Sequence, residues 1–151
     1  MTAYSQSKIN RVKRGANIAT YDVDQINSIL DDGFLCYVGY IYDGMPITIP
    51  MAYSRREDKI YIHGSTGNRM LLSILESEKT SITVMHLDGL VLARSGLHHS
   101  VNYRSVTLFG PLQKVECFKM DCKSNAAKSL GIFTTNPSKR IRQNFSGGIY
   151  H

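Results

Sequence analysis

The feature that most constrains this chain is a run of short segments with β-strand character, separated by turn signals. Asp43-Gly44 and Asp88-Gly89 are dipeptides typical of tight hairpin turns, so a hairpin is predicted at each. About six antiparallel strands are predicted, at 34–42, 47–54, 59–63, 81–87 with 90–93, 101–109 and 112–117. This number is too small for an immunoglobulin-like sandwich and favours a small closed or partly closed β-barrel. The predicted fold class is therefore mainly β.

Two short helices are predicted among these strands. Asp22 is a suitable N-cap for an amphipathic helix over 23–31, which Gly33 ends. A second helix is predicted over 68–77, because apolar residues share one helical face there: Leu71, Ile74 and Leu75. This helix lies between the third and fourth strands.

Prolines mark the second strand. Pro46 and Pro50 flank Ile47-Thr48-Ile49. Because proline cannot donate to a ladder, this strand must have an edge or a bulge at Pro50, where a ligand can meet bare backbone.

The charge is distributed unevenly along a chain long enough for one domain. The net charge is +6, but a basic arm over 1–15 carries +4 and a basic tail over 119–151 carries +5. The body, 16–118, holds 8 basic against 11 acidic side chains. A barrel that bound nucleic acid through its sheet would carry its positive charge there, so no nucleic-acid partner is expected. A helix is expected over 119–130, and no periodicity is present after Thr134.

The cellular location and the metal content are predicted from three signals that the sequence lacks: a membrane span, a signal peptide and a metal-binding motif. No apolar stretch approaches the roughly 20 residues of a membrane helix, and the polar N-terminus lacks a signal-peptide core. The cytoplasm is therefore expected, with the nucleus as a second compartment. Three cysteines, Cys36, Cys117 and Cys122, lack the paired spacing of a zinc site or a disulfide framework, so no metal is predicted.

The stretch His63-Gly64-Ser65-Thr66-Gly67-Asn68-Arg69 is typical of a phosphate site. It places small residues, hydroxyls and an arginine between a strand and the start of a helix, where backbone N–H groups and the helix dipole favour an anion. A plain capped helix with a solvated arginine explains the same residues. Arg104 lies mid-strand within Asn102-Tyr103-Arg104-Ser105 and either faces solvent or joins Arg69 on one phosphate.

Several motifs, in order and with compatible spacing over roughly residues 10–117, resemble a known family. They are Arg11-Val-Lys-Arg-Gly15, Ala19-Thr-Tyr-Asp22, Ile60-Tyr-Ile-His-Gly-Ser65 with Arg69, Leu87-Asp-Gly-Leu-Val-Leu-Ala-Arg94 and His98-His-Ser-Val-Asn-Tyr-Arg-Ser-Val106. This pattern is similar to the flavin-nucleotide-binding, nitroimidazole-resistance-type branch of the pyridoxamine 5'-phosphate oxidase-like superfamily. The resemblance implies an FMN-binding split barrel that works as a homodimer.

The resemblance also implies which residues contact the cofactor. FMN would lie between two subunits, with its phosphate or ribityl chain near His63, Gly64, Ser65, Arg69, Tyr103, Arg104 and Ser105. Its ring would lie against the backbone of the proline-marked strand, at Thr48, Ile49, Pro50 and Met51. Apolar strand residues beyond what one barrel can cover would form the dimer interface: Val101, Leu108 and Phe109.

Catalytic residues are not assigned. His98 and His99 are adjacent on a predicted strand, so they point to opposite faces and cannot both serve one site. Residues 119–151 do not resemble the family. Three functions remain open: an FMN-dependent oxidoreductase that takes electrons from a reduced nicotinamide or oxidises an amine, a non-catalytic FMN-binding module, and a barrel that binds RNA through its basic ends.

Overall fold

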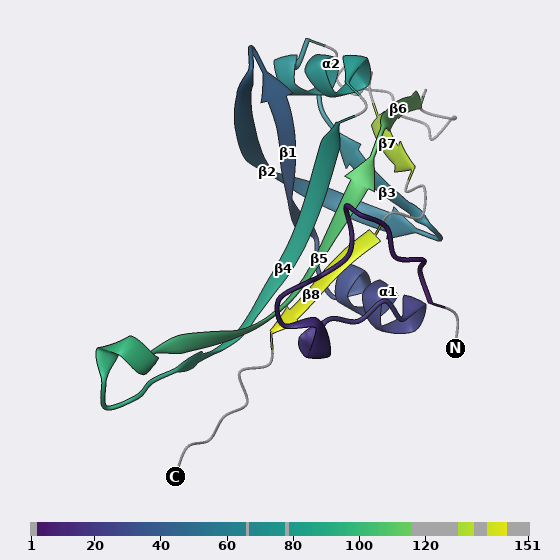
Figure 1. The fold of residues 1–151 in the computed structure, drawn as a ribbon. Helices are drawn as coiled ribbons and strands as arrows, with labels where there is room; N and C mark the ends of the chain where they lie inside the picture. Colours follow the sequence, from purple (N-terminus) through teal and green to yellow (C-terminus); the bar gives the residue numbers. More distant parts are fainter. Residues whose placement is uncertain (1–2, 66, 78, 116–129, 135–138, 145–151) are drawn as a thin grey trace.

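The computed structural model describes residues 3–65, 67–77, 79–115, 130–134 and 139–144. Within these residues, eight antiparallel strands form one strongly curved sheet in the order β6-β7-β3-β2-β1-β4-β5-β8 (Figure 1). The outermost strands of that order, β6 and β8, do not pair with each other, so the barrel is split open rather than closed. The mainly β, split-barrel prediction is confirmed, although the described strands exceed the predicted six.

The β1–β2 hairpin forms as predicted. β1 spans Leu35–Tyr42 and β2 spans Met45–Arg56, paired without interruption from Leu35↔Ala52 to Tyr42↔Met45. Asp43 and Gly44 both have positive φ, 50° and 73°. This combination is the type I′ turn, whose twist matches that of the flanking strands.

Pro46 and Pro50 lie at a free edge of β2, and the register shows no bulge there. β3 (Lys59–His63) pairs with β2 only from Tyr53 to Arg56, so Met45–Ala52 has β1 on one side and no described strand on the other. The Tyr53 N–H donates to the Phe34 carbonyl, which shows that odd-numbered residues of β2 bond toward β1. The even-numbered residues, both prolines included, direct their backbone toward the free edge.

Helix α2 (Arg69–Glu76) follows β3 and packs against β1 and β6 (Leu112–Val115). Its predicted bounds are confirmed to within one residue. Met70, Leu71 and Ile74 are buried, and the N-cap is Asn68, whose side chain accepts hydrogen bonds from the Met70 and Leu71 N–H groups. The exposed hydroxyl of Ser65 does not cap the helix.

The hairpin predicted at Asp88-Gly89 is wrong. β4 runs unbroken over Thr80–Val91 and pairs with β5 (Ser100–Gly110), with a register shift between Leu87 and Gly89. Asp88 is therefore the extra residue of a β-bulge, which bends the strand and increases its twist. The connection between the two strands lies further on, where the 3-10 helix η2 spans Gly96–His98. Figure 1 shows this long hairpin projecting beyond the rest of the sheet.

The C-terminal segment adds two strands that the sequence pattern did not predict. β7 (Leu130–Thr134) inserts between β3 and β6, and β8 (Lys139–Asn144) pairs with β5. The expectation that the chain after Thr134 lacks regular structure is therefore wrong for β8. The helix expected over 119–130 falls almost wholly outside the described residues.

The core lies inside the curved sheet and is closed by α1 (Val23–Asp31), which packs on β4 and β5. Fully buried aliphatic side chains come from both α-helices and from four strands: Ile26, Leu30, Val38, Ile60, Ile62, Ile74, Ile82, Val84, Val106 and Leu108. The N-terminal arm and the 3-10 helix η1 (Ala16–Ile18) run across β8 (Figure 1). None of the helices in the described ranges has the length and apolar character needed to cross a membrane.

Candidate functional site

The free edge of β2 exposes backbone groups that no described strand satisfies. Pro46 and Pro50 have no N–H group, so between them Thr48 carries the one N–H directed at this edge. The carbonyl groups of the same three residues face the same way. This edge therefore presents one donor surrounded by acceptors. The edge alternative predicted for Pro50 is confirmed, and the bulge alternative is wrong.

A row of small and hydroxyl side chains crosses the sheet beside this edge. On the side of the sheet opposite the core, which we call the outer face, the strand registers align Pro50 with Tyr37, Tyr37 with Thr83, and Thr83 with Thr107. The Thr83 and Thr107 hydroxyl oxygens lie 3.1 Å apart. The exposed Tyr37 ring and the two threonines were not predicted as site residues, because only the sheet order places them beside Pro50.

Gly39 lies on the outer face and carries no side chain there, and the Ser81 hydroxyl lies close to it. It is paired with Thr48 on one side and Ser81 on the other. A Cβ atom at this position would lie 2.6 Å from the Ser81 Oγ, so no larger residue fits without movement. A planar group laid on the outer face can approach the backbone closely here. Ile49 and Met51, also predicted as site residues, turn their side chains toward the core, and their backbone groups bond toward β1, so neither offers a polar group to the free edge.

The loop between β3 and α2 brings most of the predicted phosphate residues together. His63 and Ser65 are exposed, the Asn68 N–H donates to the Ser65 carbonyl at 2.9 Å, and the Gly67 N–H points at the Ser65 Oγ at 3.4 Å. A Cβ atom at Gly64 would lie 2.7 Å from a Leu71 methyl carbon, so glycine is needed for the loop to pack on α2. Thr66 lies outside the described residues.

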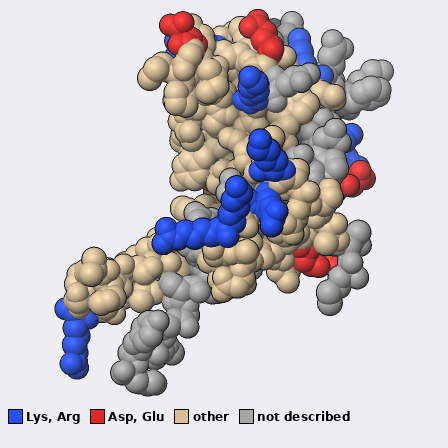
Figure 2. All heavy atoms as spheres, in the orientation of Figure 1, with Lys and Arg blue, Asp and Glu red and all other residues tan. Residues whose placement is uncertain are grey.

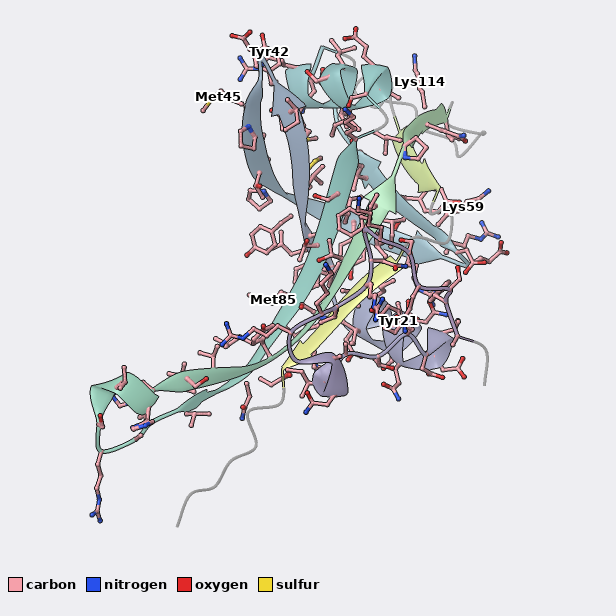
Figure 3. All side chains as sticks on the ribbon, viewed as in Figure 1. Tyr21, Tyr42, Met45, Lys59, Met85 and Lys114 are labelled. Atoms are coloured by element: carbon pink, nitrogen blue, oxygen red, sulfur yellow. The ribbon has the colours of Figure 1, made fainter. Side chains whose placement is uncertain are left out.

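Arg69 has an aromatic partner. Its guanidinium carbon lies 4.5 Å from the centre of the Tyr42 ring, a cation–π arrangement that holds the side chain at the tip of the β1–β2 hairpin. Figure 3 shows Tyr42 and Met45 at this tip, beside α2. A guanidinium that lies over a ring keeps the N–H groups in its own plane available for an anion.

Arg104 does not join Arg69, and in this chain the predicted convergence on one phosphate is wrong. Its guanidinium donates to both Asp88 oxygens, at 3.0 to 3.2 Å, and to Asp32 at 2.8 Å. These hydrogen bonds raise the pKa of Arg104 further and lower that of Asp88 below its ordinary value. Arg104 thus ties the β4 bulge to the end of α1, far from α2.

Tyr103 and Ser105 point to the opposite side of β5 from Arg104, since neighbours on a strand alternate. They lie on the outer face, where Leu87 pairs with Tyr103 and Met85 with Ser105. The three predicted residues therefore cannot act as one group. Ser105 is buried and Tyr103 is half-buried.

The C-terminal end of α1 is fastened to the sheet by side chains that the sequence analysis did not identify. Tyr53 donates its hydroxyl to the Leu30 carbonyl at 2.6 Å, and the His86 Nε2 lies 2.9 Å from the Ile29 carbonyl. Burial is the largest cause that raises the pKa of Tyr53 to about 12. A Cβ at Gly33 would lie 2.7 Å from the His86 ring, so glycine at this position admits the histidine; its φ is not positive, and the C-cap of the helix is Asp32.

Other reactive side chains do not gather into a second site within the described ranges. His98 and His99 are both exposed at the far end of the β4–β5 hairpin, where the His99 Nδ1 accepts from the Ala93 N–H at 3.0 Å. Burial raises the pKa of the Cys36 thiol to about 12; the other two cysteines lie outside the described ranges. In those ranges no three His, Cys, Asp or Glu side chains are placed to hold a metal ion.

The chain matches a protein family and several solved structures. The model of a family described as pyridoxamine 5'-phosphate oxidase matches residues 22–130, the segment from α1 to the start of β7. No curated protein matches.

Three solved structures share the fold. The flavocytochrome Anf3 from Azotobacter vinelandii is 25% identical with a TM-score of 0.80, over 93% of this chain and 75% of that one. An FAD and haem binding protein from Mycobacterium smegmatis is 24% identical with a TM-score of 0.73, over 85% and 75%. A candidate 5-nitroimidazole antibiotic resistance protein from Bacteroides thetaiotaomicron is 18% identical with a TM-score of 0.61, over 79% and 82%.

Proposed function

The chain belongs to the pyridoxamine 5'-phosphate oxidase-like family, as its motifs indicated, and from this premise we propose that it binds FMN and acts as a flavin-dependent oxidoreductase. The observation that carries the proposal is the unpaired edge of β2, within the matched segment, with its one N–H donor at Thr48 between two prolines. Two of the structural neighbours are described as flavin proteins by name, a flavocytochrome and an FAD and haem binding protein.

The residues present fit a flavin ring at this edge. One face of the ring would lie on the outer face of the sheet, over Gly39, which carries no side chain between Thr48 and Ser81. The rim of the ring carries both acceptor and donor atoms, which suit the Thr48 N–H and the carbonyls beside it. A bound flavin supplies hydride or single-electron transfer. The chain's part is to hold the ring and to exclude water from one side of it.

FMN rather than riboflavin is proposed because of the loop before α2. Arg69, held by Tyr42 at the start of α2, favours a phosphate. The exposed Ser65 hydroxyl beside it is a further donor. Arg104 is left out of this set because Asp88 and Asp32 already occupy its donors.

A reduced nicotinamide is proposed as the electron donor and a small molecule as the acceptor. One observation favours the alternative of a non-catalytic FMN-binding module. The outward side chains beside the β2 edge are hydroxyl, phenol or apolar groups, and no carboxylate or imidazole stands among those described there: Pro46, Thr48, Pro50, Tyr37, Ser81 and Thr83. Among the described residues beside this edge, a flavin would therefore find no carboxyl or imidazole group to supply protons.

A homodimer is proposed from the apolar outer face. Leu87 is 60% exposed and Met85 46%, on the same outer face as Gly39, and the β4–β5 hairpin beyond Tyr103 has no third strand among the described residues. A lone two-stranded hairpin is marginally stable in water. A second copy related by two-fold symmetry would cover this face on both chains at once. Of the residues first expected in the interface, Leu108 is fully buried in the core and Val101 is 39% exposed.

The test is a flavin titration followed by turnover. The purified protein should carry the absorbance of oxidised flavin, and flavin-free protein should quench FMN fluorescence more strongly than riboflavin fluorescence at equal concentration, with FAD as the third ligand. Steady oxidation of a reduced nicotinamide by the loaded protein supports the oxidoreductase. Tight binding without turnover supports the binding module, and the lack of binding of any flavin contradicts both.

A further inference from the structure

The N-terminal arm forms a closed loop over residues 5–13 that is fixed by a buried asparagine. Asn10 is fully buried; its side-chain oxygen accepts from the Ser7 N–H and its Nδ2 donates to the Ser5 carbonyl at 2.9 Å. The Arg11 N–H donates to the Ser7 carbonyl at 3.0 Å, which closes one turn. The loop is thus held in one conformation by its own polar groups.

Tyr21 fastens this loop to the domain. Its hydroxyl accepts from the Val12 N–H at 2.9 Å and donates to the Asn10 carbonyl at 3.0 Å. The Tyr4 N–H also donates to the Tyr21 carbonyl at 2.9 Å. Figure 3 shows Tyr21 between the arm and α1. Both ends of the loop are therefore tied to the same residue, which keeps its side chains at fixed positions.

Three cations from this loop surround one hollow. It has a volume of about 480 Å³ and is lined by Gln6, Ser7, Lys8, Arg11 and Lys13. A second hollow of about 350 Å³ adjoins it and shares Gln6, Arg11 and Lys13. Figure 2 shows several Lys and Arg side chains gathered over the arm. No ion pair within the described residues links these three cations to an acid.

A preorganised loop that brings like charges together without a carboxylate has the properties of an anion site. The three cations repel one another, and an anion bound among them removes that repulsion. Arg11 can donate two parallel hydrogen bonds to a phosphate, while Lys8 and Lys13 act as point charges and Gln6 and Ser7 add neutral donors. One monophosphate fills little of the two adjoining hollows, whereas a diphosphate with its nucleoside is of suitable size.

We propose that this hollow binds the diphosphate group of a small nucleotide, at a site separate from the β2 edge and the loop before α2. The diphosphate lies among Lys8, Arg11 and Lys13, and the rest of the nucleotide extends into the adjoining hollow toward Ala16 and Ala19. A nucleic acid fits less well, because the body of the domain, 16–118, carries 11 acidic side chains against 8 basic ones.

The experiment is a calorimetric titration of the full chain with inorganic pyrophosphate at low ionic strength. Wild type should bind, and Arg11→Gln and Lys13→Gln should each weaken binding by about tenfold, because each removes a charge-assisted contact. Raising the salt concentration should weaken binding further, since the site is open to solvent. Arg56→Gln, which removes an equally exposed cation on β2, should change the affinity by less than about twofold.

Thermal unfolding controls for folding, and Lys8→Gln is a second variant at the same hollow. Equal affinity for pyrophosphate in wild type and all three loop variants, or an equal loss of affinity with Arg56→Gln, would overturn the site.

Repeating the titration on protein loaded with FMN or with FAD separates two sources of the diphosphate. Loss of pyrophosphate binding with FAD alone assigns the diphosphate to the flavin's own nucleotide. Retention of pyrophosphate binding with both flavins assigns it to a free nucleotide. A single-stranded RNA oligonucleotide that binds more tightly than pyrophosphate and loses affinity in the same variants would overturn the small-ligand proposal.

Discussion

Two arginines that look equivalent in the sequence have different surroundings in the fold. Arg69 is exposed and stacks on Tyr42 at the start of a helix, with no carboxylate on it among the described residues. Arg104 is three-quarters buried and its donors are occupied by two carboxylates. An anion that approached Arg104 would have to displace Asp88 and Asp32, whereas Arg69 can receive one without losing a partner.

The two arginines should therefore respond differently to removal. Arg69→Ala is expected to weaken FMN binding roughly tenfold while leaving riboflavin affinity unchanged, because one charge-assisted phosphate contact is lost. Arg104→Ala should leave the preference for FMN over riboflavin intact and lower the free energy of unfolding by about 1 kcal/mol, since partly exposed ion pairs contribute little. Fluorescence titration with both ligands and denaturant unfolding measure the two effects. The opposite pattern would contradict these roles.

The sequence could identify Arg69 but not its partner. A small-residue loop, an apolar helical face and an arginine are local signals, and they predicted the start of α2 to within one residue, although the N-cap is Asn68 rather than a hydroxyl of the loop. The pairing of Arg104 with Asp32 and Asp88 depends on α1 crossing the β4 bulge, and neither contact leaves a trace in the local pattern. The row of side chains on the outer face, which includes Tyr37 and Thr83, could not be predicted from the local pattern either, because it follows from the sheet order alone.

At the scale of elements, the end of α1 is fixed by hydrogen bonds from two strands. Tyr53 on β2 and His86 on β4 bond successive carbonyl groups that would otherwise lack a partner at the helix end. Arg55 on β2 pairs with Asp31 at the same end, which lowers the pKa of that carboxyl. These contacts therefore fix the position of α1 relative to β2 and β4 at this end of the barrel.

Tyr53→Phe tests this attachment. We expect a loss of about 1 to 2 kcal/mol in the free energy of unfolding at neutral pH, because the buried Leu30 carbonyl loses its donor. The pKa of Tyr53 is raised from 10.0 to about 12 in the folded chain. Its contribution should therefore be fully present below pH 10 and should be lost as the pH rises toward 12.

Measuring the free energy of unfolding between pH 8 and pH 12 checks the direction of this pH dependence. The difference in the free energy of unfolding between wild type and Tyr53→Phe should narrow as the pH rises. A constant gap over the whole range would show that the phenol acts only through packing.

The elements that the sequence predicted well are those with strong local signals. The bounds of α1, β1 and β3 follow from an N-cap, a type I′ turn and a short alternating run. Asp88-Gly89 carries the same turn signal as Asp43-Gly44, but a bulge and a hairpin turn use the same residue types, and only long-range pairing with β5 distinguishes them. β8 was missed because Lys139–Asn144 is polar and becomes a strand only beside β5.

At the scale of the whole molecule, the open barrel leaves one large face and one projecting hairpin uncovered. The exposed apolar residues of that hairpin include Leu90 at 67%, Leu92 at 77% and Leu97 at 89%. Exposed apolar surface of this kind is typical of an interaction site. Because the flavin is proposed to lie on the outer face, a dimer that covered this face would also shield the ring from water.

Sedimentation should detect this dimer. At micromolar concentration the wild type should have a mass near twice 16.9 kDa. Leu87→Lys should shift the protein toward monomer and weaken FMN binding, because a buried charge opposes the interface. Leu72→Lys, on an exposed position of α2, should do neither. A wild-type monomer that still binds FMN would contradict the dimer.

The site at β2 is tested most directly by an FMN titration of two variants at one position. Thr48→Pro removes the one N–H that faces the free edge between Pro46 and Pro50, and it costs the β1–β2 ladder nothing because that N–H points away from β1. Thr48→Val keeps the N–H and changes only the side chain. With unchanged thermal unfolding as the control, we predict that Thr48→Pro weakens FMN binding by about tenfold and Thr48→Val by less than about twofold. FMN binding by Thr48→Pro that matches wild type would contradict the placement of the flavin on this edge.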